Sequence, residues 1–264
     1  MRSSRASLLC VLLAACDGAE PAATCGNPAR PRSTPVAFDA NGDGQLDVAD
    51  GAWLMARNFR GGREVACAAA VEAFGDKVTD VGTAYAMWYA LVAGSAVPVL
   101  DTPCAPVEDV EAACGDGVAY AFSVGTPVDG RFTANVLLSS PSLPVEAWQV
   151  SVAASGCTVA EATLTGTFGA GAPEGGRDAG VGMAEPSTGG GAVSLVVLDA
   201  VKGTMVQTAG EEILALTVQG ECGRCTLTFS DGQAGRGRPL TNVVSSGGRA
   251  YVPVTTGVEV EMCP

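Results

Sequence analysis

The sequence contains no histidine among its 264 residues, and aromatic residues make up only 5% of it. The missing imidazole excludes Ser-His and Cys-His nucleophile systems and nearly every zinc hydrolase. A glycosidase with two carboxylates needs no histidine, but the available acids lie in no motif and are better explained as solvated charges at strand ends. These acids are Glu146, Glu161, Asp199, Glu211, Glu212 and Asp231. We therefore expect a protein that is not an enzyme and that has few rings on which a sugar could stack.

Basic residues are also scarce, with 15 Lys and Arg against 28 Asp and Glu, which gives a net charge of −13. Such a charge disfavours nucleic acid and anionic membrane surfaces as partners. Long apolar runs are absent apart from Leu8 to Ala15, which follows Arg2 and Arg5. That run is shorter than the ~20 residues that a membrane span requires, and its basic flank is typical of a secretion signal.

The end of this run reads Leu13-Ala14-Ala15-Cys16, which resembles the lipobox of bacterial lipoproteins. The resemblance implies that residues 1–16 are a signal peptide with lipobox, that Cys16 is lipidated, and that residues 17–35 form a tether. An ordinary secreted product that is cut near the same place is the alternative. We therefore expect an extracytoplasmic protein that is either lipid-anchored to the cell envelope or secreted, and whose only membrane contact would be a lipid anchor.

Ten cysteines are present, of which Cys10 and Cys16 belong to the signal and the anchor. The others form an even set, which predicts disulfides in an oxidising compartment but leaves their pairing open. They are Cys25, Cys67, Cys104, Cys114, Cys157, Cys222, Cys225 and Cys263. Cys222-Gly-Arg-Cys225 also has the spacing of redox and zinc sites. Because it lies between strand-like segments with no helix after it, we expect a structural bridge near a hairpin.

Residues 39–50 read Asp-Ala-Asn-Gly-Asp-Gly-Gln-Leu-Asp-Val-Ala-Asp, which is the spacing of a twelve-residue calcium loop. Oxygen-bearing side chains occupy positions 1, 3, 5, 9 and 12, and position 7 supplies a backbone carbonyl. Gly44 stands at position 6, where the chain turns sharply. The predicted Ca²⁺ ligands are Asp39, Asn41, Asp43, Gln45, Asp47 and Asp50. A metal-free surface turn rich in Gly and Asp is the alternative.

An amphipathic helix is expected after this loop, from about Ala52 to Phe59, with Gly61-Gly62 ending it. Residues 53–62 align with residues 85–94, so a second helix repeats the first. The loop before the second helix does not repeat the ligands. At the same offset the positions are Val71, Ala73, Gly75, Thr79 and Gly82, and a shift of one residue recovers only Glu72, Asp76 and Asp80. We therefore expect a single calcium ion.

This tandem loop-helix pattern resembles the type I dockerin domain over about residues 36–115, with one intact and one degenerate repeat. The resemblance implies calcium as the cofactor, an EF-hand-like loop and a cohesin-like protein partner. Loop positions 10 and 11, which carry much of the partner recognition in dockerins, are Val48 and Ala49 here, which favours a more apolar interface. Four large side chains on the helices are expected as core between them, with exposed contact residues as the alternative: Trp53, Tyr85, Met87 and Trp88.

Short apolar or alternating runs separated by Gly, Pro, Asp and Ser replace the helical pattern after Gly117, which predicts a β-sandwich over residues 117–264. Residues 169–191 are expected to form a long loop. The predicted strands are Ala119–Val124, Phe132–Ser139, Val145–Ala153, Ala162–Phe168, Ala192–Leu198, Glu212–Val218, Thr226–Ser230, Thr241–Val244, Ala250–Val254 and Val258–Met262.

Three stretches of this half resemble cohesin domains in order and spacing. They are Val145 to Val152 around Trp148, the pair Ile213 to Val218 and Leu227 to Gly232, and Thr241 to Val244 with the glycines at 247 and 248. The expected fold class is α+β multidomain: a small all-α dockerin-like calcium-binding domain and an all-β, cohesin-like jelly-roll sandwich. Trp148 is expected in its core.

The function predicted from the sequence is protein-protein attachment at the cell surface by a non-catalytic, calcium-binding protein. The partner would be a cohesin-like module or a second copy of the chain. A carbohydrate-binding protein that tethers the cell to polysaccharide is the alternative.

Overall fold

The computed structural model describes residues 36–65, 67–71, 79–95, 97, 117–165, 181–198 and 204–263. The expected signal, Cys16 and the tether lie outside these residues. So do Cys25, Cys104, Cys114, the stretch 72–78 of the second loop and the acidic stretch 106–116. The proposed domain limits at 36, 115 and 117 therefore stay predictions.

Two α-helices and a short 3-10 helix, η1 (Ala68–Val71), make up the described N-terminal part. Helix α1 (Val48–Arg60) begins at the N-cap Asp47, whose side chain accepts from Ala49 N, and ends at Gly61, with φ of 64°. Helix α2 (Val81–Ala93) begins at the N-cap Asp80 and ends at Gly94, with φ of 67°. Carboxylate N-caps and left-handed glycine C-caps satisfy the free backbone groups at helix ends. Both expected helices and both glycine stops are confirmed, and we call α1, η1, α2 and the 39–50 loop the helical unit.

Within the described residues, twelve strands form two sheets that pack face to face as a β-sandwich. They are β1 (Ala119–Val124), β2 (Arg131–Val145), β3 (Ala147–Ser155), β4 (Thr158–Leu164), β5 (Val181–Pro186), β6 (Ala192–Val197), β7 (Val206–Gln219), β8 (Arg224–Phe229), β9 (Val243–Ser246), β10 (Arg249–Tyr251), β11 (Val254–Thr255) and β12 (Val258–Glu261). Sheet A has the order β10-β9-β3-β6-β5, and β8 joins it through β3 and pairs with β12. Sheet B has the order β11-β1-β2-β7-β4.

The sandwich core lies between the two sheets and follows from the period-two alternation of their strands. On β3, Trp148, Val150 and Val152 face inward and are fully buried. They pack in one cluster with Leu138 of β2 and Leu216 of β7, among others. The expected position of Trp148 in the core is confirmed.

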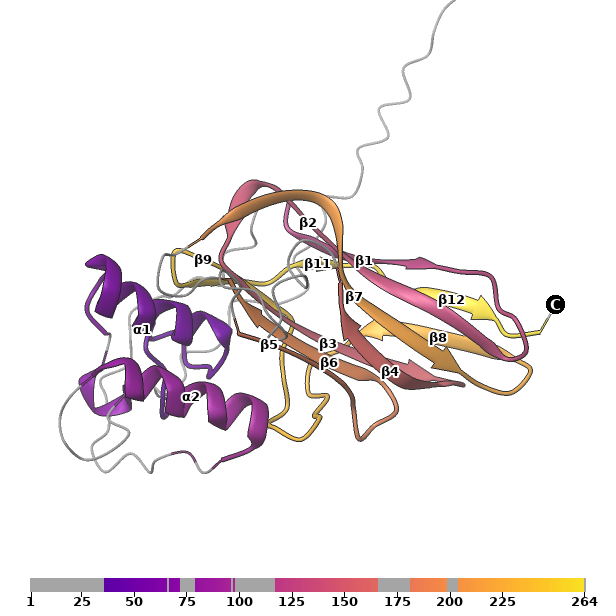
Figure 1. Cartoon of the computed structure of the whole chain (residues 1–264), viewed down its shortest axis with the longest axis horizontal. Helices are drawn as coiled ribbons and strands as arrows, with labels where there is room; N and C mark the ends of the chain where they lie inside the picture. The colour runs from indigo at the N-terminus through magenta and orange to yellow at the C-terminus, as the bar shows by residue number, and fades with distance from the viewer. Residues whose placement is uncertain are drawn as a thin grey trace, which may run out of the picture.

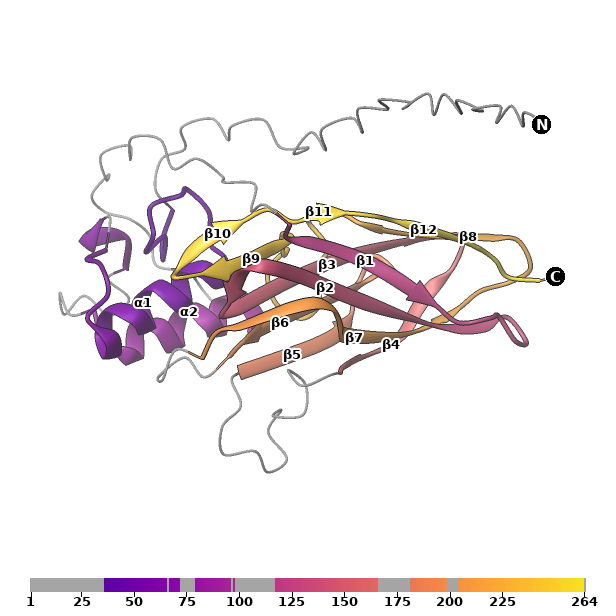
Figure 2. The same cartoon turned by 90° about the horizontal axis from the view of Figure 1, so that it is seen from above.

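A second apolar cluster lies on the other face of sheet A, where the helical unit covers it. Ala147 of β3 and Leu195 of β6 point outward from the sandwich and are fully buried against the helices. Both views place α1 and α2 beside each other at one end of the sandwich, near β9 (Figure 1, Figure 2). Helix α1 contacts β3, β6, β9 and β10. Sheet A is therefore buried on both faces, and the molecule has three layers where the helices lie.

Two strand predictions were wrong. Ala250–Val254 was expected to be one strand, yet β10 ends at Tyr251 and pairs with β9, while β11 begins at Val254 and pairs with β1 of the other sheet. The stretch 169–191 was expected to be a loop, yet Val181–Pro186 forms β5, which pairs with β6 from Val181↔Val197 to Pro186↔Ala192. Strand β5 was not predicted because it contains Gly182 and Pro186, and neither residue favours a central strand. An edge strand such as β5 tolerates a proline that cannot donate to a ladder.

Two disulfides tie the far end of the sandwich together. Cys157 pairs with Cys225, with Cα atoms 5.2 Å apart, and Cys222 pairs with Cys263, with Cα atoms 5.0 Å apart. The two cysteines of the Cys222-Gly-Arg-Cys225 stretch therefore have structural roles, as expected, but each bonds a different partner. Cys67 is disulfide-bonded as well.

Candidate functional site

The 39–50 loop curls around the side chain of Asp39. Its Oδ1 accepts from Gly42 N at 2.7 Å and its Oδ2 accepts from Gly44 N at 2.9 Å. Both glycines have positive φ, 80° and 79°, a conformation that side chains with a Cβ disfavour. The sharp turn expected at Gly44 is thus present.

Asp50, in the first turn of α1, closes the loop from the other end. Its Oδ1 accepts from Ala40 N at 2.7 Å and from Asn41 N at 3.3 Å, while its Oδ2 accepts from Asp47 N at 2.9 Å. Asp47 and Asp50 together form the capping box of α1. The carboxylates at positions 9 and 12 therefore shape both the loop and the start of the helix.

The remaining expected ligands continue the same curl. Asn41 Oδ1 accepts from Asp43 N at 3.0 Å, Asp43 Oδ1 accepts from Gln45 N at 3.0 Å, and Asn41 Nδ2 donates to Asp43 Oδ2 at 3.2 Å. Asn41, Asp43 and Gln45 are half-buried. The structure thus brings all six sequence-predicted residues into one small loop at the N-terminus of α1.

The loop concentrates acid in a site shielded from solvent, since Asp39, Asp47 and Asp50 are all 0% exposed. Burial, and then repulsion from Asp43, raises the pKa of Asp39 to about 6. Burial, and then repulsion from Asp47, Asp43 and Asp39, holds the pKa of Asp50 well above its usual range. Among the described residues, no Lys or Arg forms an ion pair with Asp39 or Asp50.

The donor chemistry of the loop fits a hard cation, because all six residues supply oxygen. The carboxylate oxygens named above accept from backbone amides of the loop and of the α1 N-terminus, except Asp43 Oδ2, which accepts from Asn41 Nδ2. In the described part of the chain, no three acidic or cysteine side chains are gathered at metal-binding spacing. Binding of an ion would therefore require a local rotation of these side chains, while the curl of the backbone is already in place.

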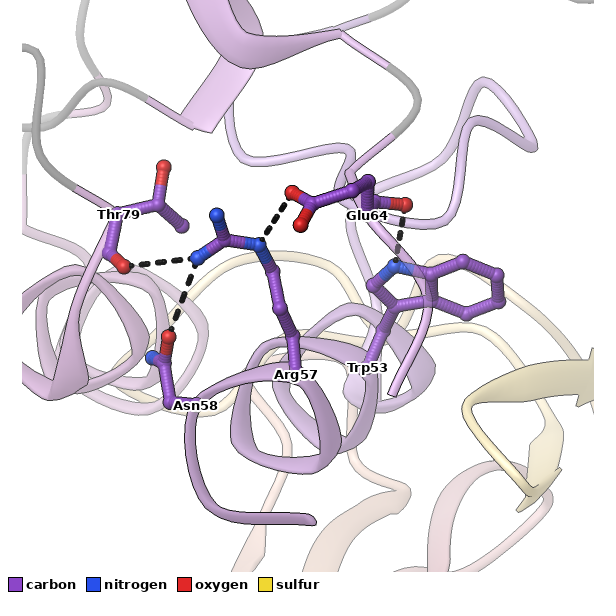
Figure 3. Close-up of polar contacts among 5 residues, drawn as sticks. All are labelled: Trp53, Arg57, Asn58, Glu64 and Thr79. Atoms are coloured by element: carbon purple, nitrogen blue, oxygen red, sulfur yellow. Dashed lines mark hydrogen bonds and ion pairs between the residues drawn. The ribbon is translucent and has the colours of Figure 1, made fainter. Parts of the chain in front are cut away.

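The helical unit is tied internally by Arg57 of α1 (Figure 3). Its Nε contacts Glu64 Oε2 at 2.8 Å, and its Nη1 donates to Thr79 O at 3.1 Å and to Asn58 Oδ1 at 3.3 Å. Trp53 Nε1 donates to Glu64 O at 3.3 Å. These contacts hold the segment after α1 and the start of α2 against the same side of α1.

The four large helix residues, Trp53, Tyr85, Met87 and Trp88, differ in how far they are buried. Met87 and Trp88 are buried, as expected of core. Tyr85 is 59% exposed, so its expected place in the core was wrong. Trp53 is half-buried and lies against the turn between β9 and β10, since a Cβ on Gly248 would meet its ring at 2.9 Å. Helical spacing and the repeat predicted that these residues lie on helices, but not which element each one faces.

Contacts between the helical unit and the sandwich were not predicted from the sequence. Asn41 Nδ2 donates to Gly248 O at 3.4 Å, and Arg238 N donates to Leu91 O of α2 at 3.1 Å. Glu146 was expected to be a solvated charge, but it is 2% exposed and contacts Arg60 of α1 at 3.5 Å. No local pattern could have revealed this, because its partners are 86 or more residues away in the sequence.

No helix among the described residues is long and apolar enough to cross a membrane. The disulfides are typical of proteins that fold in an oxidising compartment.

No protein-family model matches the sequence, and no curated protein sequence matches it either. Solved structures of cohesin domains resemble it. The seventh ScaB type I cohesin of Pseudobacteroides cellulosolvens is 12% identical, with a TM-score of 0.37. The match covers 54% of this chain and 91% of the cohesin chain. The cohesin CaCohA2 of Clostridium acetobutylicum is 15% identical, with a TM-score of 0.39, and covers 55% and 91%. Similarities of this size leave the family of the chain open.

Proposed function

We propose that this protein is a non-catalytic, calcium-binding protein of the cell surface that attaches to another protein. The observation that carries the calcium part is the set of buried carboxylates in the 39–50 loop. Asp39, Asp47 and Asp50 are fully buried, and the pKa values of Asp39 and Asp50 are raised. A divalent cation would offset both the burial cost and the mutual repulsion that raise them.

The residues that would hold the ion are Asp39, Asn41, Asp43, Gln45, Asp47 and Asp50. When bound, Ca²⁺ supplies positive charge and a preference for oxygen ligands. Asp47 and Asp50 also cap α1, so ordering their carboxylates would fix the start and the direction of that helix. Calcium would therefore act on the shape of the helical unit.

The attachment part is supported by the exposed side of α2. This helix carries no charged residue, and Tyr85 and Tyr89 are 59% and 49% exposed, with ring centroids 5.1 Å apart. Tyrosine is enriched in protein interfaces because it combines apolar area with a hydroxyl group. The two rings are tilted by 41° to each other, so they do not form the flat platform that a sugar ring would need. This geometry favours a protein partner over the polysaccharide alternative.

The test of calcium binding is isothermal calorimetry on residues 17–264 in calcium-depleted buffer. We expect one ion per chain, and we expect Asp43→Ala to abolish the heat. Asp80→Asn, which keeps an N-cap in the second repeat, is the matched control and should bind as the wild type does. If neither heat nor a calcium-dependent rise in melting temperature is observed, the loop is a metal-free turn and the proposal is wrong.

Two further measurements address the partner class. Sedimentation velocity over a concentration series, with calcium and with EDTA, tests whether a second copy is the partner. Retention on insoluble glycans that survives Tyr85→Ala and Tyr89→Ala would instead support sugar binding at the sandwich.

A further inference from the structure

The outer face of sheet A is an apolar surface that the helical unit covers. Its side chains lie in one cluster with residues of both helices. From the sandwich these are Ala147, Val193, Leu195, Val197 and Val243, and from the helices Leu54, Met55, Met87 and Leu91; none is more than 3% exposed. An apolar face of this kind would be open to water if the helical unit moved away.

A polar contact lies at the edge of this apolar interface and centres on Glu146, between β2 and β3. Its side chain is 3% exposed. Its Oε1 accepts from Ser245 Oγ at 3.1 Å and from Gly248 N in the turn after β9, and its Oε2 contacts Arg60 Nη2 at 3.5 Å. One buried carboxylate therefore holds both a turn of the sandwich and the last turn of α1.

The same turn reaches the 39–50 loop. Gly248 O accepts from Asn41 Nδ2 at 3.4 Å, and the backbone of Gly248, with φ of 75°, lies against Trp53 of α1. The turn is thus contacted by the loop, by the middle of α1 and by Glu146. A side chain at position 248 would have to enter the ring of Trp53, which explains the glycine.

We propose that Glu146 and the turn at residues 246–249 form a latch through which calcium binding in the loop controls the docking of the helical unit on sheet A. The proposal rests on the calcium site proposed above. Asn41 is both an expected calcium ligand, through Oδ1, and the hydrogen-bond donor to Gly248 O, through Nδ2, so the ion and the turn would fix the same side chain through different atoms. An ordered loop keeps Asn41 and Trp53 in contact with the turn. With a disordered loop, Arg60–Glu146 is the polar contact that remains at this turn, beside the apolar cluster.

The consequence is that calcium would change how tightly the helical unit docks on sheet A. An ion pair such as Arg60–Glu146, whose carboxylate is buried, is a poor anchor on its own, because desolvation offsets much of its attraction. Loss of the contacts made by the loop should therefore loosen the docking without unfolding the sandwich, which has its own core.

Backbone hydrogen exchange of residues 17–264, with and without calcium, tests the latch, and small-angle scattering follows the radius of gyration. On calcium removal we expect exchange at residues 246–249 and in α1 to rise at least roughly tenfold, the radius to increase, and exchange in β1 and β2 to stay unchanged. In the presence of calcium, Glu146→Gln should produce the same changes while calcium heat persists. Glu161→Gln, an exposed residue of β4, is the matched control and should change nothing.

The outcomes separate the two proposals. If the wild type binds calcium and the loop becomes protected, but exchange at residues 246–249 is the same with and without calcium, the latch is wrong and the calcium site stands. If no calcium heat is found, the proposed function fails, and the latch fails with it. If Glu146→Gln does not fold, Arg60→Ala removes the contact from the helix side and should give the same rise in exchange at the turn.

Discussion

Single residues of the 39–50 loop have several roles at once. Asp50 accepts from Ala40 N, Asn41 N and Asp47 N, so one carboxylate closes the loop and caps α1. Asp39 holds Gly42 and Gly44 in the positive-φ curl. Such dense local bonding explains how a loop with so much buried negative charge can keep its shape, and it also makes the loop sensitive to anything that changes that charge.

The first prediction concerns pH in calcium-free buffer. The pKa of Asp39 is raised from 3.8 to about 6, so the folded protein binds more protons than the unfolded chain between these values. Stability must therefore fall as pH rises through this window, by up to roughly 3 kcal/mol from this group. Urea unfolding at several pH values should show the fall, and saturating calcium should remove it, because the ion favours the ionised carboxylates.

Asp39→Asn is the matched variant for this experiment. Its neutral side chain should remove the part of this fall that comes from Asp39, while the part that comes from Asp50, whose pKa is also raised, should remain. A wild-type protein that gains stability across the same range in the absence of calcium would contradict the raised pKa.

The second prediction concerns Gly51 of α1, where a small residue allows the two helices to pack closely. A Cβ there would lie 2.1 Å from Trp88 Nε1 and 2.5 Å from Met87 Cε, so the glycine lets α2 pack closely on α1. Gly51→Ala should lower the free energy of unfolding by roughly 1–3 kcal/mol through overpacking, in spite of the better helix propensity of alanine. Urea unfolding measures it. Gly125→Ala, where the nearest atom is 3.6 Å from the added Cβ, should be close to neutral.

At the scale of elements, the two helices have the same kinds of N-cap and C-cap but differ in the segment that precedes them. Each starts at an aspartate N-cap and ends at a left-handed glycine. In α1 the N-cap Asp47 also belongs to the acidic loop, whereas in α2 the N-cap Asp80 bonds Thr83 in a simple capping box. The repeat in the sequence is therefore a repeat of helices and caps.

Substitution of the two N-caps should separate capping from calcium binding. Asp80→Ala should cost about 1 kcal/mol of stability, the value of a lost N-cap, equally with and without calcium. Asp47→Ala should cost a similar amount without calcium and clearly more with it, because it also removes an expected ligand. Thermal or urea unfolding of both variants at low and high calcium provides the comparison, and equal calcium effects on the two would contradict a role for Asp47 in binding.

At the scale of the whole molecule, sheet A is the middle layer between two apolar cores. Its inner face packs in the sandwich and its outer face packs on the helices. Leu195 of β6 is fully buried in the outer cluster, while Leu216 of β7 is fully buried in the inner one. The two leucines thus allow each interface to be weakened separately.

Leu195→Ala should lower the free energy of unfolding by roughly 2–5 kcal/mol and should raise hydrogen exchange mainly in α1 and α2, since the cavity lies beneath them. Leu216→Ala should cost a similar amount but should raise exchange in the strands of both sheets. Hydrogen exchange with mass spectrometry distinguishes the two patterns. Identical patterns for both variants would mean that helices and sandwich unfold only as one unit.

Much of this protein was determined by local sequence. The loop at 39–50, the two helices with their glycine stops and most of the strands follow from spacing, capping and alternation, because these depend on residues a few positions apart. One exception is β5, which contains Gly182 and Pro186. It forms because β6 provides backbone hydrogen-bond partners at the edge of the sheet.

Only the tertiary structure decided what the helices face. Packing between segments far apart in the chain determines that Glu146 is buried and that Tyr85 is exposed. It also places the Trp53 side chain against Gly248. The pairing of Cys157 with Cys225 and of Cys222 with Cys263 was decided in the same way. Local patterns carry no information about such contacts, because the apolar side of a helix or strand shows only that it will be covered, and the layer that covers it is chosen by the packing of the whole chain.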